Sequence, residues 1–231
     1  MKNILLLAVV ALLFTSCKKA SNKSNDSNQL VDIDGNKYPI VKIGDKTWSA
    51  KNLNVSRYRN GDPIPQVTDP DEWDALTTGA WCYYENFTNN GVVYGKLYNR
   101  YAVLDSRGLA PAGWHVATFS DWRALDNTFG GIGAAGDKMK DLSSNLWMSP
   151  LPTSSNSSGF SALPGGIRYE GAAFMFKGEM GFWWSSTDAG PGYNGPDDAN
   201  INARAIQDNS LFLFLDYYNP NKGMSVRCVR D

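Results

Sequence analysis

One segment near the C-terminal end of the chain concentrates oxygen-bearing side chains beside an aromatic ring. The segment covers residues 188–200 and lies between two stretches that are rich in apolar residues. Carboxylate and amide oxygens are the ligands that calcium prefers, and a tyrosine ring can stack on the apolar face of a sugar. We therefore treat this segment as a candidate ligand or calcium loop, and a solvated loop without a ligand is the alternative. Its candidate residues are Asp188, Tyr193, Asn194, Asp197, Asp198 and Asn200.

Patterns typical of catalysis are missing from the rest of the sequence. His115 is the only histidine, which excludes histidine-based triads and histidine-rich zinc sites. Its neighbours Trp114 and Val116 instead predict a structural position on a short strand. The sequence also lacks a nucleophile elbow, a phosphate-binding loop and a C-x-x-C motif. We therefore expect a protein that is not an enzyme, and a divergent enzyme remains as a further alternative.

Residues 32–36 imitate the start of a calcium-binding loop with the sequence DIDGN. A complete EF-hand loop also needs a glycine at its sixth position and a glutamate at its twelfth. Lys37 and Ile43 occupy those two positions here. The motif therefore predicts a β-turn that Asp and Asn side chains stabilise, and the sequence gives no confident metal site.

The N-terminal residues predict export and lipid anchoring. Residues 1–16 combine a basic Lys2, a short apolar run and small residues before Cys17, as in a secretory signal peptide. This arrangement resembles the lipobox of bacterial lipoproteins, which implies acylation of the Cys17 thiol and attachment to a membrane. An ordinary cleaved signal peptide is the alternative. We expect a cell-envelope protein anchored in the outer membrane, although Lys18 and Lys19 leave its periplasmic or surface orientation open.

The residues after Cys17 predict a tether followed by one folded domain. Residues 17–29 are polar and carry no aromatic side chain, so they cannot bury enough apolar surface to fold. Residues 30–231 have the length of a single domain with one core. The formal net charge of the chain is −1 and no basic stripe is present, so we expect no nucleic-acid partner.

Lipidation of Cys17 leaves two further cysteines, Cys82 and Cys228. Outside the cytoplasm they either pair as a disulfide or remain free, and their spacing in the sequence does not decide between the two.

Hydrophobic patterns predict a mixture of short strands and helices. Residues 31–53 carry alternating β-branched and aromatic residues separated by turns, which is typical of successive strands. Thr118 precedes a helical spacing of apolar residues that continues to Phe129, and a second, shorter helix is expected over residues 134–142. Residues 211–215 are continuously apolar, which favours a central strand covered on both faces.

Residues 156–187 combine tight glycine-proline turns with aromatic residues, and they predict the β scaffold of the domain. Trp183 and Trp184 within it point to opposite faces of a strand, so we expect one in the core and consider Trp183 for exposure. Trp73, in the acidic segment 69–74, is the other candidate for an exposed aromatic.

Several motifs in this order resemble one known family. They are VDIDGNKYPIVKIGDKTWSAKNLN, GAWCYYEN, YGKLYNRYAV, PAGWHVATFSDWRAL, NSSGFSALPGGIR, GFWWSST and GMSVRCVRD. Together they resemble the Fibrobacter succinogenes major paralogous domain, which occurs in lipoproteins of Bacteroidota and Fibrobacterota. The resemblance implies an α+β, C-type-lectin-like fold of short antiparallel strands, one or two helices and long loops. The family usually has a cysteine where this chain has Ala110, which removes any disulfide built on that position.

The resemblance names no activity, because the family has no established one. We expect a non-catalytic binding or adhesion module for a glycan or another envelope protein, since this fold class displays variable loops on a rigid core. A structural or assembly component of the envelope without a small ligand is the alternative.

Overall fold

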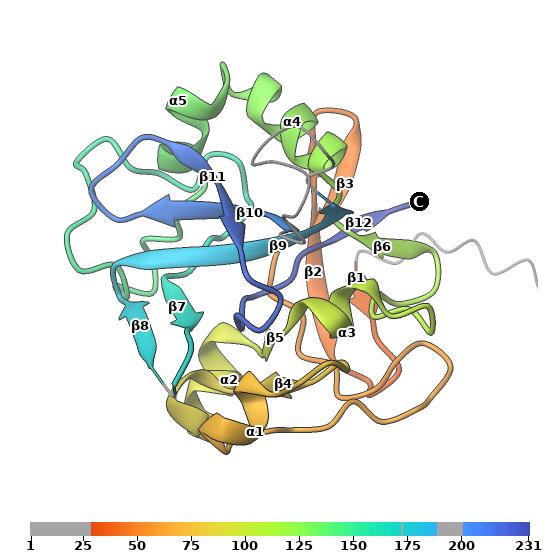
Figure 1. Ribbon diagram of the computed structural model, residues 1–231. Coiled ribbons are helices and arrows are strands. Elements are labelled where there is room, and N and C mark those ends of the chain that lie inside the picture. The colour runs from red at the N-terminus through yellow and green to blue at the C-terminus, as the bar shows by residue number, and fades with distance from the viewer. Residues whose placement is uncertain (1–28, 172, 189–200) are drawn as a thin grey trace, which may run out of the picture.

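A computed structural model describes residues 29–171, 173–188 and 201–231 of the chain (Figure 1). Within these residues, two five-stranded sheets and one two-stranded sheet form the framework. The first sheet has the order β1 (Gln29–Val31), β2 (Lys37–Ile43), β3 (Lys46–Ser49), β12 (Cys228–Arg230) and β6 (Trp114–Val116). The second has the order β11 (Leu213–Tyr218), β10 (Ile201–Gln207), β9 (Met180–Asp188), β7 (Gly165–Arg168) and β8 (Phe174–Lys177). The small sheet pairs β4 (Trp81–Cys82) with β5 (Leu97–Tyr98).

Short helices lie at two ends of this framework. In Figure 1, α4 and α5 lie together at one end, and α1 and α2 lie at the opposite end near β4. The helices are α1 (Pro70–Asp74), α2 (Thr88–Tyr94), α3 (Arg100–Leu104), α4 (Phe119–Thr128) and α5 (Ile132–Ala135), with 3₁₀ turns at Tyr84–Asn86 and Gly136–Lys138. The named strands of the described residues pair antiparallel, apart from β7 with β9, which is parallel. The predicted α+β class with short antiparallel strands is therefore confirmed.

The first turn forms as the sequence predicts. The Asp32 carboxylate accepts backbone N–H bonds from Asp34 at 3.0 Å and from Asn36 at 2.9 Å. Gly35 takes a φ of +84°, which glycine adopts at little cost. The motif thus closes the connection between β1 and β2 as a side-chain-stabilised turn, and the turn prediction is confirmed.

The start of α4 also follows the sequence. The Thr118 side chain accepts a hydrogen bond from the Asp121 backbone, and the Asp121 carboxylate accepts one from the Thr118 backbone in return. This capping box satisfies two backbone donors that a helix start leaves unpaired. Trp122 and Leu125 are buried on one face of α4 as predicted. The second helix is shorter than expected, because a 3₁₀ turn replaces α5 from Gly136 onward.

Strand β9 runs through the core with both faces covered. Trp184 packs in the cluster that contains Tyr98 and Met224, whereas Trp183 packs with Trp48, Trp122 and Phe160 on the opposite face. Both indoles are fully buried. The prediction that Trp183 is exposed is therefore wrong, since a strand inside a five-stranded sheet has no solvent-facing side here.

Trp73 is also fully buried, contrary to the expectation from its acidic surroundings. Its ring packs under the Arg168 guanidinium, whose carbon lies 4.2 Å from the ring centroid, and its indole N–H donates to the Asn221 carbonyl. Helix α1 turns the ring inward while Asp71 and Glu72 remain exposed in its first turn.

The apolar run at residues 211–215 is not a central strand. Among the strands that the structure describes, β11 pairs only with β10 and forms one edge of its sheet. Leu211 and Phe212 precede the strand and are 41% and 47% exposed, whereas Leu213 is fully buried. The prediction failed because continuous hydrophobicity does not show how many neighbouring strands are available to cover it.

Cys82 and Cys228 are both buried free thiols, so the disulfide considered from the sequence does not form. Cys82 lies on β4 beside Trp73 and Tyr84, whereas Cys228 belongs to the central cluster. Burial raises the pKa of Cys82 to about 11 and that of Cys228 to about 12. Both groups are therefore protonated at neutral pH. Among the described residues, no helix has the length and apolar character needed to cross a membrane.

Candidate functional site

Most of the loop predicted to bind a ligand lies outside the described residues. These are Tyr193, Asn194, Asp197, Asp198 and Asn200. Asp188 is described as the last residue of β9, where its backbone pairs with Ile201 of β10. The described part of the chain contains no group of three or more acidic, histidine or cysteine side chains arranged to hold a metal ion. The calcium and ligand hypotheses for this loop therefore remain predictions.

A different site is visible as an open cleft of about 310 Å³, which we call the β2–α2 cleft. One wall comes from β2 and from the segment that follows β3, and the other comes from the C-terminal half of α2. The lining residues are Asn36, Lys37, Tyr38, Pro39, Ala50, Lys51, Asn52, Asn54, Gly91, Val92, Val93, Tyr94, Gly95, Asp141, Ser161, Leu163 and Arg227.

Two glycines hold the α2 wall in place. Gly91 lies against the Tyr83 ring so closely that a Cβ atom would overlap it. Gly95 ends the helix with a φ of +78°, and a Cβ there would lie 2.9 Å from the Leu53 carbonyl oxygen. The Asn52 amide then donates to the Tyr94 carbonyl at 2.8 Å and fixes the end of α2 to the segment after β3.

The floor of the cleft is a buried arginine held by neutral acceptors. Arg227 is fully buried, and its guanidinium donates to the Asn52 side chain at 2.7 Å. It also donates to the backbone carbonyls of Ser49, Phe160 and Ser161 at 2.7–2.9 Å. No carboxylate of the described residues lies within ion-pairing distance of it. Burial lowers the pKa of Arg227 to about 9.

A second buried cation, Lys96, lies beside the cleft residue Asn54. Lys96 donates to the backbone carbonyl of Asn54 at 2.5 Å, and its ammonium lies 4.3 Å from the centroid of the Trp81 ring. Burial lowers the pKa of Lys96 to about 8, although Asp34 and Asp32 oppose that shift. Asn54 lines the cleft, so it connects the Lys96 ammonium group to the cleft edge.

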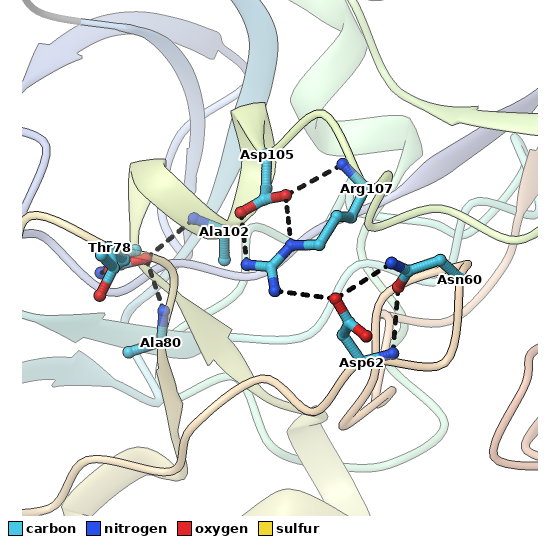
Figure 2. A network of polar contacts seen from close by, with 8 residues as sticks. Asn60, Asp62, Thr78, Ala80, Ala102, Asp105 and Arg107 are labelled. Atoms are coloured by element: carbon cyan, nitrogen blue, oxygen red, sulfur yellow. Dashed lines mark hydrogen bonds and ion pairs between the residues drawn. The ribbon is translucent and has the colours of Figure 1, made fainter.

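A further cavity near α3 is lined by charged side chains that form a polar network (Figure 2). Arg107 pairs with both carboxylate oxygens of Asp105 at 2.8 Å, and it reaches Asp62 at 3.2 Å. Asn60 in turn binds Asp62 through its side-chain nitrogen at 3.0 Å. Arg107 is thus neutralised within the protein, and this network fixes the loops around residues 60 and 105 instead of offering free groups to a ligand.

Asn99 fixes the segment beside α3. Its side-chain oxygen accepts the backbone N–H groups of Ala80 and Ala102, each at 3.0 Å, and its amide donates to the Thr78 carbonyl at 2.8 Å. Figure 2 labels these three partners. Asn99 therefore acts as the N-cap of α3 and as a brace for β4.

His115 has structural neighbours on both ring nitrogens. Nδ1 lies 2.7 Å from an Asp231 carboxylate oxygen, and Nε2 lies 2.9 Å from the Asp121 carboxylate. The histidine therefore links β6 to the start of α4 and to the last residue of the sequence. This placement agrees with the structural role predicted for His115.

The β2–α2 cleft was missed by the sequence reasoning. Its charged and amide residues come from segments around positions 36, 52, 141 and 227, which no local motif connects. The only sequence signal was the polar run around Asn52 and Asn54 immediately after a strand, and that pattern is common in ordinary loops.

Comparison with known proteins supports the resemblance seen in the motifs. A family model described as the Fibrobacter succinogenes major domain matches residues 41–230. No curated protein matches the chain, and no solved structure matches it. The match extends from β2 to β12 and so includes most of the framework that builds the cleft. The chain belongs to the Fibrobacter succinogenes major domain family.

Proposed function

We propose that this protein is a lipid-anchored component of the cell envelope whose folded domain binds a glycan without transforming it. The observation that carries the binding role is the β2–α2 cleft, with polar and charged walls on a framework of paired strands. Binding sites are commonly placed on loops that a rigid scaffold positions. The C-type-lectin-like fold implied by the motifs agrees with such a role.

The anchoring part of the proposal rests on the sequence around Cys17. The signal-like residues 1–16 and the polar residues 17–29 together suit a lipidated cysteine followed by a spacer. Metabolic labelling with an alkyne fatty acid tests this, because the wild-type protein should acquire the label and the Cys17→Ser variant should not. Label on the variant, or none on either protein, would contradict the anchor. Protease treatment of intact cells then distinguishes a surface orientation from a periplasmic one.

A glycan array tests the binding part. The mature protein, purified in detergent, should bind a subset of glycans, and substitution of Lys51 in the cleft should change that subset. The Asp197→Asn, Asp198→Asn double variant separately tests the loop predicted from the sequence. If no glycan binds and the protein co-purifies stoichiometrically with another envelope protein, the structural or assembly role replaces this proposal. Turnover of a bound glycan by the purified protein would instead establish an enzyme.

A further inference from the structure

The unpaired polar groups of the β2–α2 cleft are mainly hydrogen-bond donors. Lys37 and Lys51 are exposed, and neither ammonium group has a partner among the described residues. The Asn54 side-chain nitrogen likewise lacks one, while its oxygen faces Lys96 at 3.3 Å. On the acceptor side, the cleft offers the side-chain oxygen of Asn36 and Oδ2 of Asp141, whose Oδ1 already accepts hydrogen bonds from the Ser143 backbone and hydroxyl. A ligand that complements these walls must therefore contribute acceptors.

The charges of the cleft favour the same kind of ligand. Three cations line it, namely Lys37, Lys51 and Arg227, whereas Asp141 is its one lining carboxylate. The buried Arg227 has only neutral acceptors, so its charge is not compensated locally. A buried charge without a counter-ion keeps much of its desolvation cost. An anion bound above it offsets that cost.

The dimensions of the cleft favour a small ligand over a polypeptide surface. Its volume of about 310 Å³ is at the lower end of the range for small-molecule sites. A stable protein–protein interface instead buries about 800 Å² on each partner. The amide groups of Asn36 and Asn54 suit the hydroxyl groups of a sugar ring.

We propose that the β2–α2 cleft binds a carboxylate-bearing sugar, the acidic unit of an anionic glycan. The ammonium groups of Lys37 and Lys51 contact the carboxylate, and the Asn54 amide contacts a ring hydroxyl or the ring oxygen. Arg227 acts from the floor through its charge, because its guanidinium is buried and already bonded. This assignment rests on the proposed glycan-binding function and adds the chemical class of the ligand.

Two probes of equal size separate the role of the charge from that of the sugar ring. Calorimetric titration of the mature protein in detergent compares digalacturonate with uncharged digalactose at low and at physiological salt. Because hydrogen bonds to a charged group are roughly twice as strong as neutral ones, the acidic disaccharide should bind roughly tenfold or more tightly than the neutral one. Salt should reduce that difference, since the ammonium groups are exposed to solvent.

Matched variants locate the site. Lys51→Glu should weaken digalacturonate binding at least about tenfold, because it replaces an attractive contact with a repulsive one. Lys42→Glu is the control, since Lys42 is also exposed and lies on β2 but does not line the cleft. Both changes are on the surface, and equal thermal unfolding midpoints would show that both variants fold. An equal loss of binding in the two variants would mean that overall charge, and not the cleft, governs affinity.

The outcomes distinguish this inference from the function on which it rests. Equal binding of the acidic and neutral disaccharides would overturn the preference for an acid and leave glycan binding intact. If neither disaccharide binds, but other glycans on an array do and Lys51→Glu leaves them unaffected, the cleft assignment fails alone. If no glycan of any kind binds, the proposed function and this inference both fail.

Discussion

The side-chain oxygen of Asn52 accepts a hydrogen bond of 2.7 Å from Nε of Arg227. The same oxygen accepts the indole N–H of Trp183 at 2.8 Å. The Asn52 amide nitrogen donates to the Tyr94 carbonyl and to the Ser225 hydroxyl. One buried amide thus joins the segment after β3 to α2, β9 and the approach to β12, and it uses all four of its hydrogen-bonding positions.

Replacing Asn52 should therefore destabilise the fold strongly. Asn52→Ala leaves the Trp183 indole, the Arg227 guanidinium and the Tyr94 carbonyl each short of a partner in a buried site. Unpaired buried polar groups cost about 1–3 kcal/mol each, so we expect a loss of at least about 2–4 kcal/mol in denaturant unfolding. Asn60→Ala, at an exposed asparagine, should cost far less.

Asn52→Asp separates the loss of hydrogen bonds from the effect of charge. The aspartate keeps acceptors for Arg227 and Trp183 and loses the two donors, but it gives Arg227 a counter-ion. If the Arg227 charge is uncompensated, Asn52→Asp should be less destabilising than Asn52→Ala at pH 7. Equal or greater destabilisation by the aspartate would show that Arg227 does not need a negative partner, which would weaken the argument for an anionic ligand.

Lys96 should make stability depend on pH under alkaline conditions. Burial lowers its pKa from 10.5 to about 8 in the folded protein. Between these values the unfolded chain binds more protons, so this group makes the free energy of unfolding rise with pH from about 8 to 10.5. Below pH 8 the cost of burying the charge is fully present. The expected slope is at most about 1.4 kcal/mol per pH unit.

Urea unfolding of wild type and Lys96→Met across pH 7–11 measures this contribution as the difference between the two curves. The variant should gain less stability than wild type as the pH rises, whereas Lys42→Met should follow wild type throughout. A constant difference between wild type and Lys96→Met would show that the Lys96 pKa is not lowered. The difference between proteins is the relevant quantity, because the buried Cys82 and Cys228 also titrate in this range.

The start of α4 should contribute to acid stability through Asp121. Burial opposes its charge, but hydrogen bonds from Thr118 and contacts with His115 and Lys46 outweigh that effect and lower the pKa of Asp121. The stabilisation is present above the ordinary pKa of 3.8 and is lost as pH falls through the lower folded value. Asp121→Asn should therefore reduce stability at pH 7 more than at pH 2.

Thr118→Ala tests the cap itself. It should cost about 1 kcal/mol at neutral pH, because the Asp121 backbone N–H loses its side-chain acceptor. Serine retains the hydroxyl, so Thr118→Ser should restore most of this stability. Circular dichroism during urea unfolding measures both variants, and equal losses in the alanine and serine proteins would argue against the capping role.

Local chemistry explains which parts of the fold the sequence predicts well. The cap of α4 depends on Thr118 and Asp121, which are three residues apart, and the first turn depends on residues 32–36. In both cases the interacting groups are neighbours in the chain. Position 91 shows the limit of this reasoning, since its glycine lies inside α2 because the Tyr83 ring leaves no room for a side chain.

Long-range packing explains what the sequence leaves open. The burial of Trp73 depends on Arg168 and Asn221, which are far away in the chain, and the edge position of β11 depends on strand order. The β2–α2 cleft is a similar case, because the buried Asn52 connects its walls. A polar residue with four distant partners has the same local pattern as a surface loop residue, so only the assembled fold shows its role.

Gly79 lies in close contact with Tyr58, so substitutions at these two positions should affect stability in a coupled way. A Cβ atom on Gly79 would overlap the buried Tyr58 hydroxyl and would lie 2.9 Å from Cα of Ala102. Gly79→Ala should therefore destabilise the protein by about 1–3 kcal/mol through overpacking. The Tyr58 hydroxyl makes no hydrogen bond of normal geometry within the described residues and lies near the Asp105–Arg107 pair, so Tyr58→Phe alone should change stability little.

The double variant should lose less stability than the sum of the two single changes, because removing the hydroxyl relieves one of the two clashes. The remaining contact with Ala102 should keep the rescue incomplete. Chemical unfolding of all four proteins gives the coupling energy, which we expect to be about 0.5–2 kcal/mol in favour of the double variant. Strict additivity would mean that the backbone at Gly79 shifts away from Tyr58. The close approach of Gly79 to the Tyr58 hydroxyl would then not be what requires glycine at this position.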